Sequence, residues 1–76
     1  MTDTFDRIKK ALDEGGTLCV SNHYHAWIIT HDMWLASLKR GIPAIKLSGR
    51  SIYVALGKRY HCIDYCRLTL TKPAAN

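Results

Sequence analysis

Three cysteines and four histidines are the side chains of this sequence best suited to metal binding or nucleophilic chemistry. Zinc is usually held by four nitrogen or sulfur ligands at roughly 2.0–2.3 Å, commonly as two close pairs along the chain. Six residues could supply such a set: Cys19, His23, His25, His61, Cys62 and Cys66. In one continuous strand, at about 3.3 Å per residue, Cys62 and Cys66 would stand roughly 13 Å apart and could not share an ion. Only a turn between these two cysteines would bring their thiols together, so the sequence predicts no metal and no cofactor, with the cysteines packing as small apolar residues.

A cysteine nucleophile is the one enzymatic site that these residue types suggest. A catalytic thiol needs a lowered pKa, a nearby base, and a third group that orients the base. His61 or His25 could serve as the base, with Asp64 orienting it. Because His61 and Cys62 are adjacent, their side chains would point to opposite faces of a strand. The sequence therefore predicts a protein that is not an enzyme.

Positive charge is concentrated in the second half of the chain. The formal net charge is +5, from 11 Lys and Arg residues against 6 Asp and Glu residues. Residues 33–63 contain no acidic residue but six basic ones: Lys39, Arg40, Lys46, Arg50, Lys58 and Arg59. A field of one sign favours an acidic partner, most often a nucleic acid or an acidic protein surface. Binding driven by this charge should weaken steeply as the salt concentration rises.

A basic and aromatic surface is the binding site that the sequence favours. Lysine and arginine neutralise phosphates, and exposed tyrosines give unpaired bases a flat ring on which to stack. The predicted contact residues are Lys39, Arg40, Lys46, Arg50, Tyr53, Lys58, Arg59, Tyr60 and Arg67. The same residues could instead form a solvated sheet face, with tyrosines covering apolar surface and cations guarding edge strands. The expected partner is a protein complex that handles nucleic acid, or nucleic acid itself.

The N-terminal part of the chain predicts a helix followed by a β-hairpin. The helix begins at Asp3 or Thr4, carries an apolar stripe at spacings of three and four, and ends at a glycine pair. Residues 17–21 and 26–30 are rich in β-branched and aromatic residues. The polar residues 22–25 between them suit a hairpin loop.

A second helix is predicted over residues 32–40, and Pro43 prevents it from continuing. Its inward face should be formed by Trp34, Leu35 and Leu38. Trp27 is expected in the core together with Trp34.

Three strands are expected in the C-terminal part of the chain. Residues 44–48 and 52–56 are the first two, and the third runs from about 60 to 70, with a bulge. A flexible tail is expected over 71–76. The element order is helix, two strands, helix, three strands. This order predicts a single α+β domain over residues 1–70, with an antiparallel sheet of four to five strands.

The turn between the last two predicted strands sets their register. Gly57-Lys58 fits a two-residue hairpin turn that requires glycine first, which places Leu56 opposite Arg59. Tyr53 and Tyr60 should then lie on the open face of the sheet, near Lys46 and Lys58. The opposite face, toward the helices, should hold Ile52, Val54, Leu56 and Ile63.

Residues 38–54, with the sequence LKRGIPAIKLSGRSIYV, resemble the helix-to-wing segment of excisionase and MerR-type winged-helix proteins. In that family an arginine-glycine pair, followed by Ile-Pro-Ala, joins the recognition helix to a small β wing. The resemblance covers 17 of the 76 residues. It implies that residues 31–40 form a recognition helix and that Lys46 and Arg50 contact phosphate from the wing. The protein would then be a direct DNA-binding regulator.

Small single-domain chains without an enzymatic signature also resemble, in kind, accessory proteins of phages and plasmids, including anti-CRISPR and other anti-defence inhibitors. The acidic N-terminus lacks the pattern of a secretion signal, and the longest apolar run, 26–29, is too short to span a bilayer. We therefore predict a cytoplasmic, non-catalytic binding protein with reduced thiols and no membrane contact. Exposed sheet edges could also let it form a homodimer.

Overall fold

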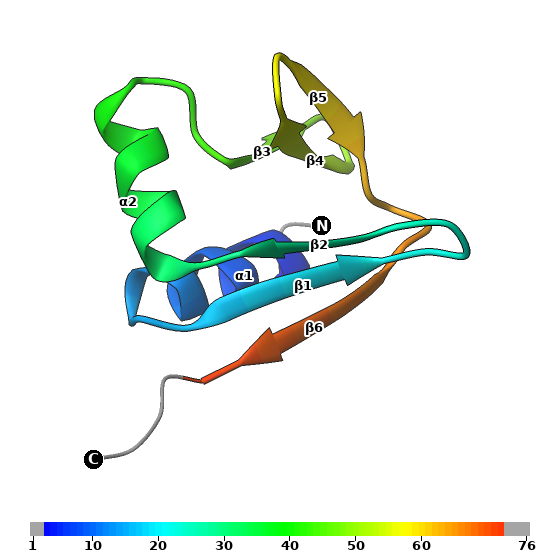
Figure 1. Cartoon of the computed structure of the whole chain (residues 1–76), viewed down its shortest axis with the longest axis horizontal. Helices are drawn as coiled ribbons and strands as arrows, with labels where there is room; N and C mark the ends of the chain where they lie inside the picture. The colour runs from blue at the N-terminus through cyan, green and yellow to red at the C-terminus, as the bar shows by residue number, and fades with distance from the viewer. Residues whose placement is uncertain (1–2, 73–76) are drawn as a thin grey trace.

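The computed structural model describes residues 3–72, which form two helices and six strands (Figure 1). The helices are α1 (Asp3–Asp13) and α2 (His31–Lys39). The strands are β1 (Thr17–Ser21), β2 (Ala26–Ile29), β3 (Ile45–Ser48), β4 (Ser51–Leu56), β5 (Arg59–Cys62) and β6 (Arg67–Thr71). The predicted α+β class and the general order of elements are confirmed. No helix within residues 3–72 has the length and apolar character needed to cross a membrane.

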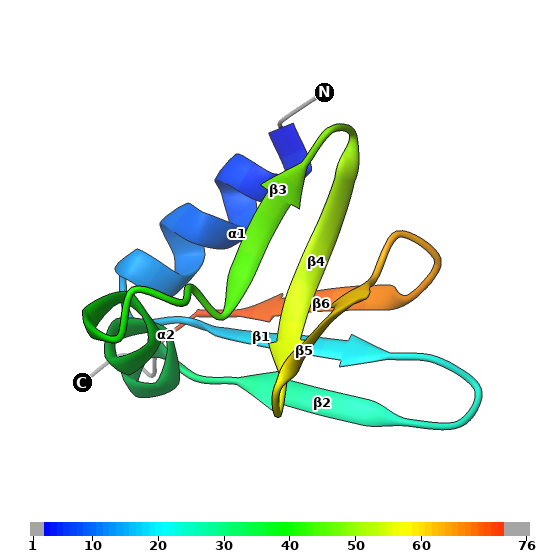
Figure 2. The same ribbon diagram turned by 90° about the horizontal axis from the view of Figure 1, so that it is seen from above.

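The six strands form two antiparallel sheets of three strands each. One sheet has the order β2-β1-β6 and the other the order β3-β4-β5. Figure 2 shows the strands of the second sheet running across those of the first, with α1 alongside β3. One core lies between these layers, because buried residues from both sheets and both helices form a single cluster that includes Leu12, Leu18, Trp34, Ile45 and Val54.

The long last strand predicted over residues 60–70 is wrong, since the structure divides this segment into β5 and β6. A turn at Asp64 and Tyr65 separates the two strands and sends them to different sheets. The Asp64 carboxylate accepts a hydrogen bond of 3.0 Å from the backbone N–H of Ile52. The N–H of Cys66 donates to the carbonyl of Ile63 at 3.1 Å. These two bonds turn the chain, so there is one strand more than the predicted maximum of five.

The C-terminal strand also extends one residue beyond its predicted end. Thr71, placed in the predicted tail, is the last residue of β6 and pairs with Thr17 of β1. Residues 73–76 of that tail lie outside the described residues.

The predicted inward face of the second helix is correct for Trp34 but wrong for Leu35 and Leu38. The side chains of α2 that are buried are Trp34 and Ser37, whereas Leu35 and Leu38 are 40% and 42% exposed. The indole Nε1 of Trp34 donates to Asp13 at 2.7 Å, which fixes the helix against the end of α1. At about 100° per residue, the centre of the buried face lies between Trp34 and Ser37, so Leu35 stands about 130° from it and Leu38 about 70° from it, at its border.

The predicted register of the β4-β5 hairpin is confirmed. Leu56 is opposite Arg59, Ala55 is opposite Tyr60, and Tyr53 is opposite Cys62. Gly57 has a φ of +66°, the left-handed value that glycine adopts without steric cost. The inward face predicted from this register is present, with Ile52, Val54 and Ile63 buried.

Candidate functional site

The outer face of the β3-β4-β5 sheet holds the centre of the predicted contact set. Strand alternation buries Ile45 and Val54 and turns their neighbours Lys46 and Tyr53 to the other face. Lys46 pairs with Tyr53 across the β3-β4 ladder. The Nζ atom of Lys46 lies 4.1 Å from the ring centroid of Tyr60 and 5.9 Å from that of Tyr53. Both distances fall within the roughly 6 Å range of cation–π attraction. We call Lys46, Tyr53 and Tyr60 the aromatic platform.

A hydrogen bond fixes one ring of the aromatic platform. The hydroxyl of Tyr60 donates to the backbone carbonyl of Pro43 at 2.7 Å, and both tyrosines of the platform are half-buried. The ring of Tyr60 therefore has its polar end engaged and Lys46 above its face. A nucleic-acid base could stack on that face only after displacing Lys46.

The only acidic residue beyond position 32 is engaged within the fold. Asp64 accepts the N–H of Ile52, and this hydrogen bond is the main reason that its pKa is lowered below the usual value. The side chains of Ser51 and Cys62 lower the pKa further, while partial desolvation opposes them. The basic side chains of β3, β4, β5 and their turns therefore share this part of the chain with a single carboxylate, which is already hydrogen-bonded.

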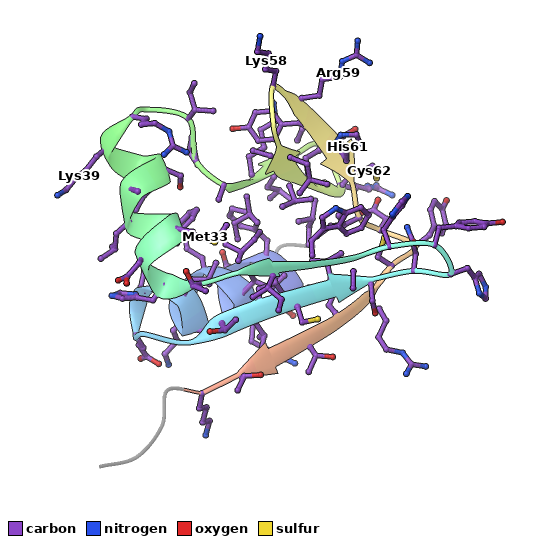
Figure 3. The ribbon with its side chains drawn as sticks, in the orientation of Figure 1. Met33, Lys39, Lys58, Arg59, His61 and Cys62 are labelled. Atoms are coloured by element: carbon purple, nitrogen blue, oxygen red, sulfur yellow. The ribbon has the colours of Figure 1, made fainter. Side chains whose placement is uncertain are left out.

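The remaining predicted contacts lie at several places around this sheet. Lys58 and Arg59 extend from the β4-β5 turn away from the body of the molecule (Figure 3). Arg50 lies in the β3-β4 turn, at the opposite end of the six-residue strand β4. At about 3.3 Å per residue, the two turns stand roughly 20 Å apart. The aromatic platform thus lies between basic turns at both ends of β4.

Three predicted contacts come from other elements. Lys39 points away from the hairpin (Figure 3). Arg40 follows α2 and lines a groove that also reaches Gly57 of the β4-β5 turn. Arg67 begins β6 in the other sheet and lines a small cavity with His23 and Tyr65. The structure therefore does not place Lys39 and Arg67 beside the aromatic platform.

Two exposed tyrosines were missed by the sequence reasoning. Tyr24 is 86% and Tyr65 98% exposed, each in a loop, whereas the platform tyrosines are half-buried. The polar residues around Tyr24 were the available signal. For Tyr65 there was none, because a strand was expected there.

The cysteines and histidines considered for metal chemistry are partly brought together. Because the chain turns at Asp64 and Tyr65, a cavity of about 460 Å³ has both Cys62 and Cys66 in its lining, along with His25 and His61. Nevertheless, within residues 3–72 no three side chains of the metal-binding types are grouped so that they could hold an ion. Cys19, Cys62 and Cys66 are free thiols.

Comparison of the chain with protein-family models, with curated proteins and with solved structures found no match in any of the three.

Proposed function

We propose that this chain is a non-catalytic binding protein that docks on an acidic partner through the outer face of its β3-β4-β5 sheet. The observation that carries the proposal is the position of Lys46, whose ammonium group lies over Tyr60 and Tyr53 on a face with basic turns at both ends. A carboxylate approaching this face would meet Lys46 at the centre and further cations at the rim.

The aromatic platform would reduce the entropic cost of such binding. Ordering a lysine side chain costs up to about 2 kcal/mol of rotamer freedom. Lys46 already has a preferred position over the rings, and the Tyr60 hydroxyl bond holds one of those rings in place. Part of the ordering cost is therefore met before the partner arrives, which is how preorganisation raises affinity.

A protein partner is favoured over nucleic acid by the environment of the rings and by the surface of α2. Stacking on Tyr60 would have to displace Lys46. The exposed part of α2 includes Met33, Leu35 and Leu38, which cannot hydrogen-bond to base edges. We therefore place the acidic partner among protein complexes that handle nucleic acid. The protein would block such a complex sterically, in the manner of the phage and plasmid accessory proteins that include anti-CRISPR inhibitors.

Direct DNA binding is the second candidate, and the path of residues 38–54 favours it. α2 ends before Gly41, whose φ is +77°, and the β3-β4 hairpin follows with Arg50 in its turn. A helix followed by a hairpin is the local arrangement that the winged-helix resemblance implies. However, α2 is preceded by strands β1 and β2, whereas the winged-helix family has a helix there.

Fluorescence anisotropy titrations with three labelled probes separate these candidates. The probes are poly-L-glutamate, single-stranded DNA and duplex DNA, each at about 50 and 200 mM salt. We expect poly-L-glutamate to bind more tightly at low salt and Lys46→Glu to weaken that binding. Lys9→Glu on α1 changes the net charge equally and should have the smaller effect. Equal weakening of poly-L-glutamate binding by both variants would refute the outer face of the β3-β4-β5 sheet as the binding site. Duplex DNA that binds more tightly than poly-L-glutamate, through Lys46 and Arg50, would favour direct DNA binding.

A further inference from the structure

Exposed apolar side chains gather around α2. Of the seven large apolar residues that are exposed within residues 3–72, four lie on this helix or directly after it: Met33 at 51%, Leu35 at 40%, Leu38 at 42% and Ile42 at 55%. Large exposed apolar surface on a small protein commonly marks an interaction site.

Met33 and Ile42 line a groove between α2, β2 and the end of the β4-β5 hairpin. The groove has a volume of about 510 Å³ and also includes Trp27 of β2 and Leu56 of β4. Figure 3 shows Met33 directed toward the space between α2 and the strands, whereas Lys39 points away. Leu35 and Leu38 line a separate hollow with Asp32. The groove is thus a defined apolar site with Met33 on one wall.

The edge of β2 that borders the groove is unpaired in its sheet. The strand order β2-β1-β6 leaves β2 with a neighbour on one side only. An edge strand offers backbone N–H and C=O groups that another extended chain can pair with, as in β-strand addition. This feature favours a polypeptide as the occupant.

The charge around the groove determines which polypeptide it would accept. Arg40 is the one charged residue in its lining, and Gly57, at its end, is followed directly by Lys58 and Arg59. A second copy of this chain would bring another net charge of +5 and the same basic rim into contact with these cations. A segment with carboxylates would instead compensate them.

We propose that this groove binds an extended segment of a partner protein, with bulky apolar side chains flanked by Asp or Glu. The apolar side chains would fill the space beside Met33, Ile42 and Leu56, the backbone would extend β2, and the carboxylates would face Arg40 and Lys58. The inference rests on the proposed function, because that proposal identifies the partner as an acidic protein. It adds an apolar contact site outside the aromatic platform.

Selection from a random peptide library displayed on phage, with the wild-type protein as bait, tests the inference. We expect the enriched peptides to combine at least two bulky apolar residues with flanking acids. One such peptide, synthesised and labelled, should perturb the methyl NMR signals of Met33, Ile42 and Leu56. Failure to enrich peptides, enrichment without this composition, or perturbation of a different surface would each overturn the inference.

Three variants test the groove with the selected peptide. Met33→Glu should weaken peptide binding roughly ten-fold or more, because it removes a central apolar contact and repels carboxylates. Leu35→Glu, the control on the other flank of α2, should change it by less than about three-fold. Circular dichroism should show both α2 variants folded, since Met33 and Leu35 are exposed.

The third variant separates this inference from the proposed function. Lys46→Glu should spare peptide binding while weakening the binding of poly-L-glutamate. Unchanged peptide binding by Met33→Glu would refute the groove, whereas unchanged poly-L-glutamate binding by Lys46→Glu would refute the aromatic platform. Sedimentation that shows a wild-type dimer, dissociated by Met33→Glu, would identify a second copy as the occupant and also overturn the inference.

Discussion

The hydroxyl of Tyr60 donates a 2.7 Å hydrogen bond to the carbonyl of Pro43, and this bond ties β5 to the loop that leaves α2. The ring that makes this bond also lies beneath the ammonium group of Lys46. One tyrosine therefore supports both the loop between α2 and β3 and the centre of the candidate binding face. Stability and binding should accordingly respond together to changes at this residue.

Replacing Tyr60 with Phe should lower the free energy of unfolding by about 1 kcal/mol, because a part-buried hydrogen bond is lost while the ring remains. Urea denaturation measures this change. Tyr65→Phe removes a hydroxyl from a side chain that is 98% exposed and should change stability by less than about 0.5 kcal/mol. Equal effects of the two variants would show that the Tyr60–Pro43 bond contributes nothing.

Replacing Ser37 with Ala should destabilise the fold by roughly 1–3 kcal/mol, because a buried donor loses its partner. The Ser37 hydroxyl accepts from the N–H of Ala44 at 2.8 Å and donates to the carbonyl of Trp34 at 2.6 Å. Urea denaturation gives the loss, and amide exchange at Ala44 should become faster. The exposed Ser48→Ala is the control, and comparable losses in both variants would contradict this account.

Replacing Asp64 with Asn should make the free energy of unfolding depend less on pH in the acidic range. The Ile52 N–H holds the pKa of Asp64 below its usual value, so the folded state binds a proton less readily than the unfolded state. A depressed folded-state pKa adds stability above the unfolded pKa of about 4, and this stability is lost as pH falls through the folded value. Below about pH 5, the free energy of unfolding of the wild type should therefore decrease more steeply with falling pH than that of Asp64→Asn.

Urea denaturation between about pH 2.5 and 7 tests the Asp64 prediction. Glu14→Gln, at the exposed position after α1, controls for the loss of one negative charge. If the free energy of unfolding had the same pH dependence in wild type and Asp64→Asn, the hydrogen bond to Ile52 would not lower the pKa of Asp64 in the folded state.

Replacing Gly16 with Ala should destabilise the fold by about 3 kcal/mol, at the upper end of overpacking costs. A Cβ atom at this buried position would lie 2.8 Å from the carbonyl oxygens of both Ala11 and Thr71. These oxygens belong to the backbone of α1 and β6, so neither can move alone. Thermal or urea denaturation would measure the loss.

Gly57→Ala is the matched control for Gly16→Ala. Apart from Gly57 and its two chain neighbours, no atom lies within 4 Å of a Cβ at this position. Its φ of +66° opposes the substitution, at a cost of roughly 1–2 kcal/mol. A smaller loss at Gly16 than at Gly57 would contradict the close approach of α1 and β6.

The fold was predictable where one local rule decided the outcome. Gly57-Lys58 fixed the β4-β5 register, because a two-residue turn that needs glycine first leaves one pairing of the flanking strands. The break between β5 and β6 was not predictable from strand propensity. It depends on Asp64 accepting the N–H of Ile52, a residue twelve positions earlier in the chain.

The candidate site was predictable only where strand alternation decides which face of the sheet a side chain occupies. The alternation in β3 and β4 placed Lys46 and Tyr53 on the outer face, but the contact of Tyr60 with Pro43 requires the tertiary fold. Likewise, Leu35 and Leu38 follow the apolar pattern of an inward face, and only the burial of Ser37 with Trp34 shows that α2 is rotated away from it. That rotation turns Met33 toward the strands, where it lines one wall of the apolar groove.

Replacing Arg50, Lys58 and Arg59 together with Glu should weaken poly-L-glutamate binding by at least ten-fold, because it reverses the charge at both ends of β4. The substitutions change the net charge from +5 to −1, since three reversals remove six charges. Surface charges contribute little to folding, so thermal unfolding should remain near that of the wild type. Arg7, Lys9 and Lys10 changed to Glu on α1 give the same net charge at another site. If this control lost as much affinity as the first variant, the binding would follow total charge, and the outer face of the β3-β4-β5 sheet would have no special role.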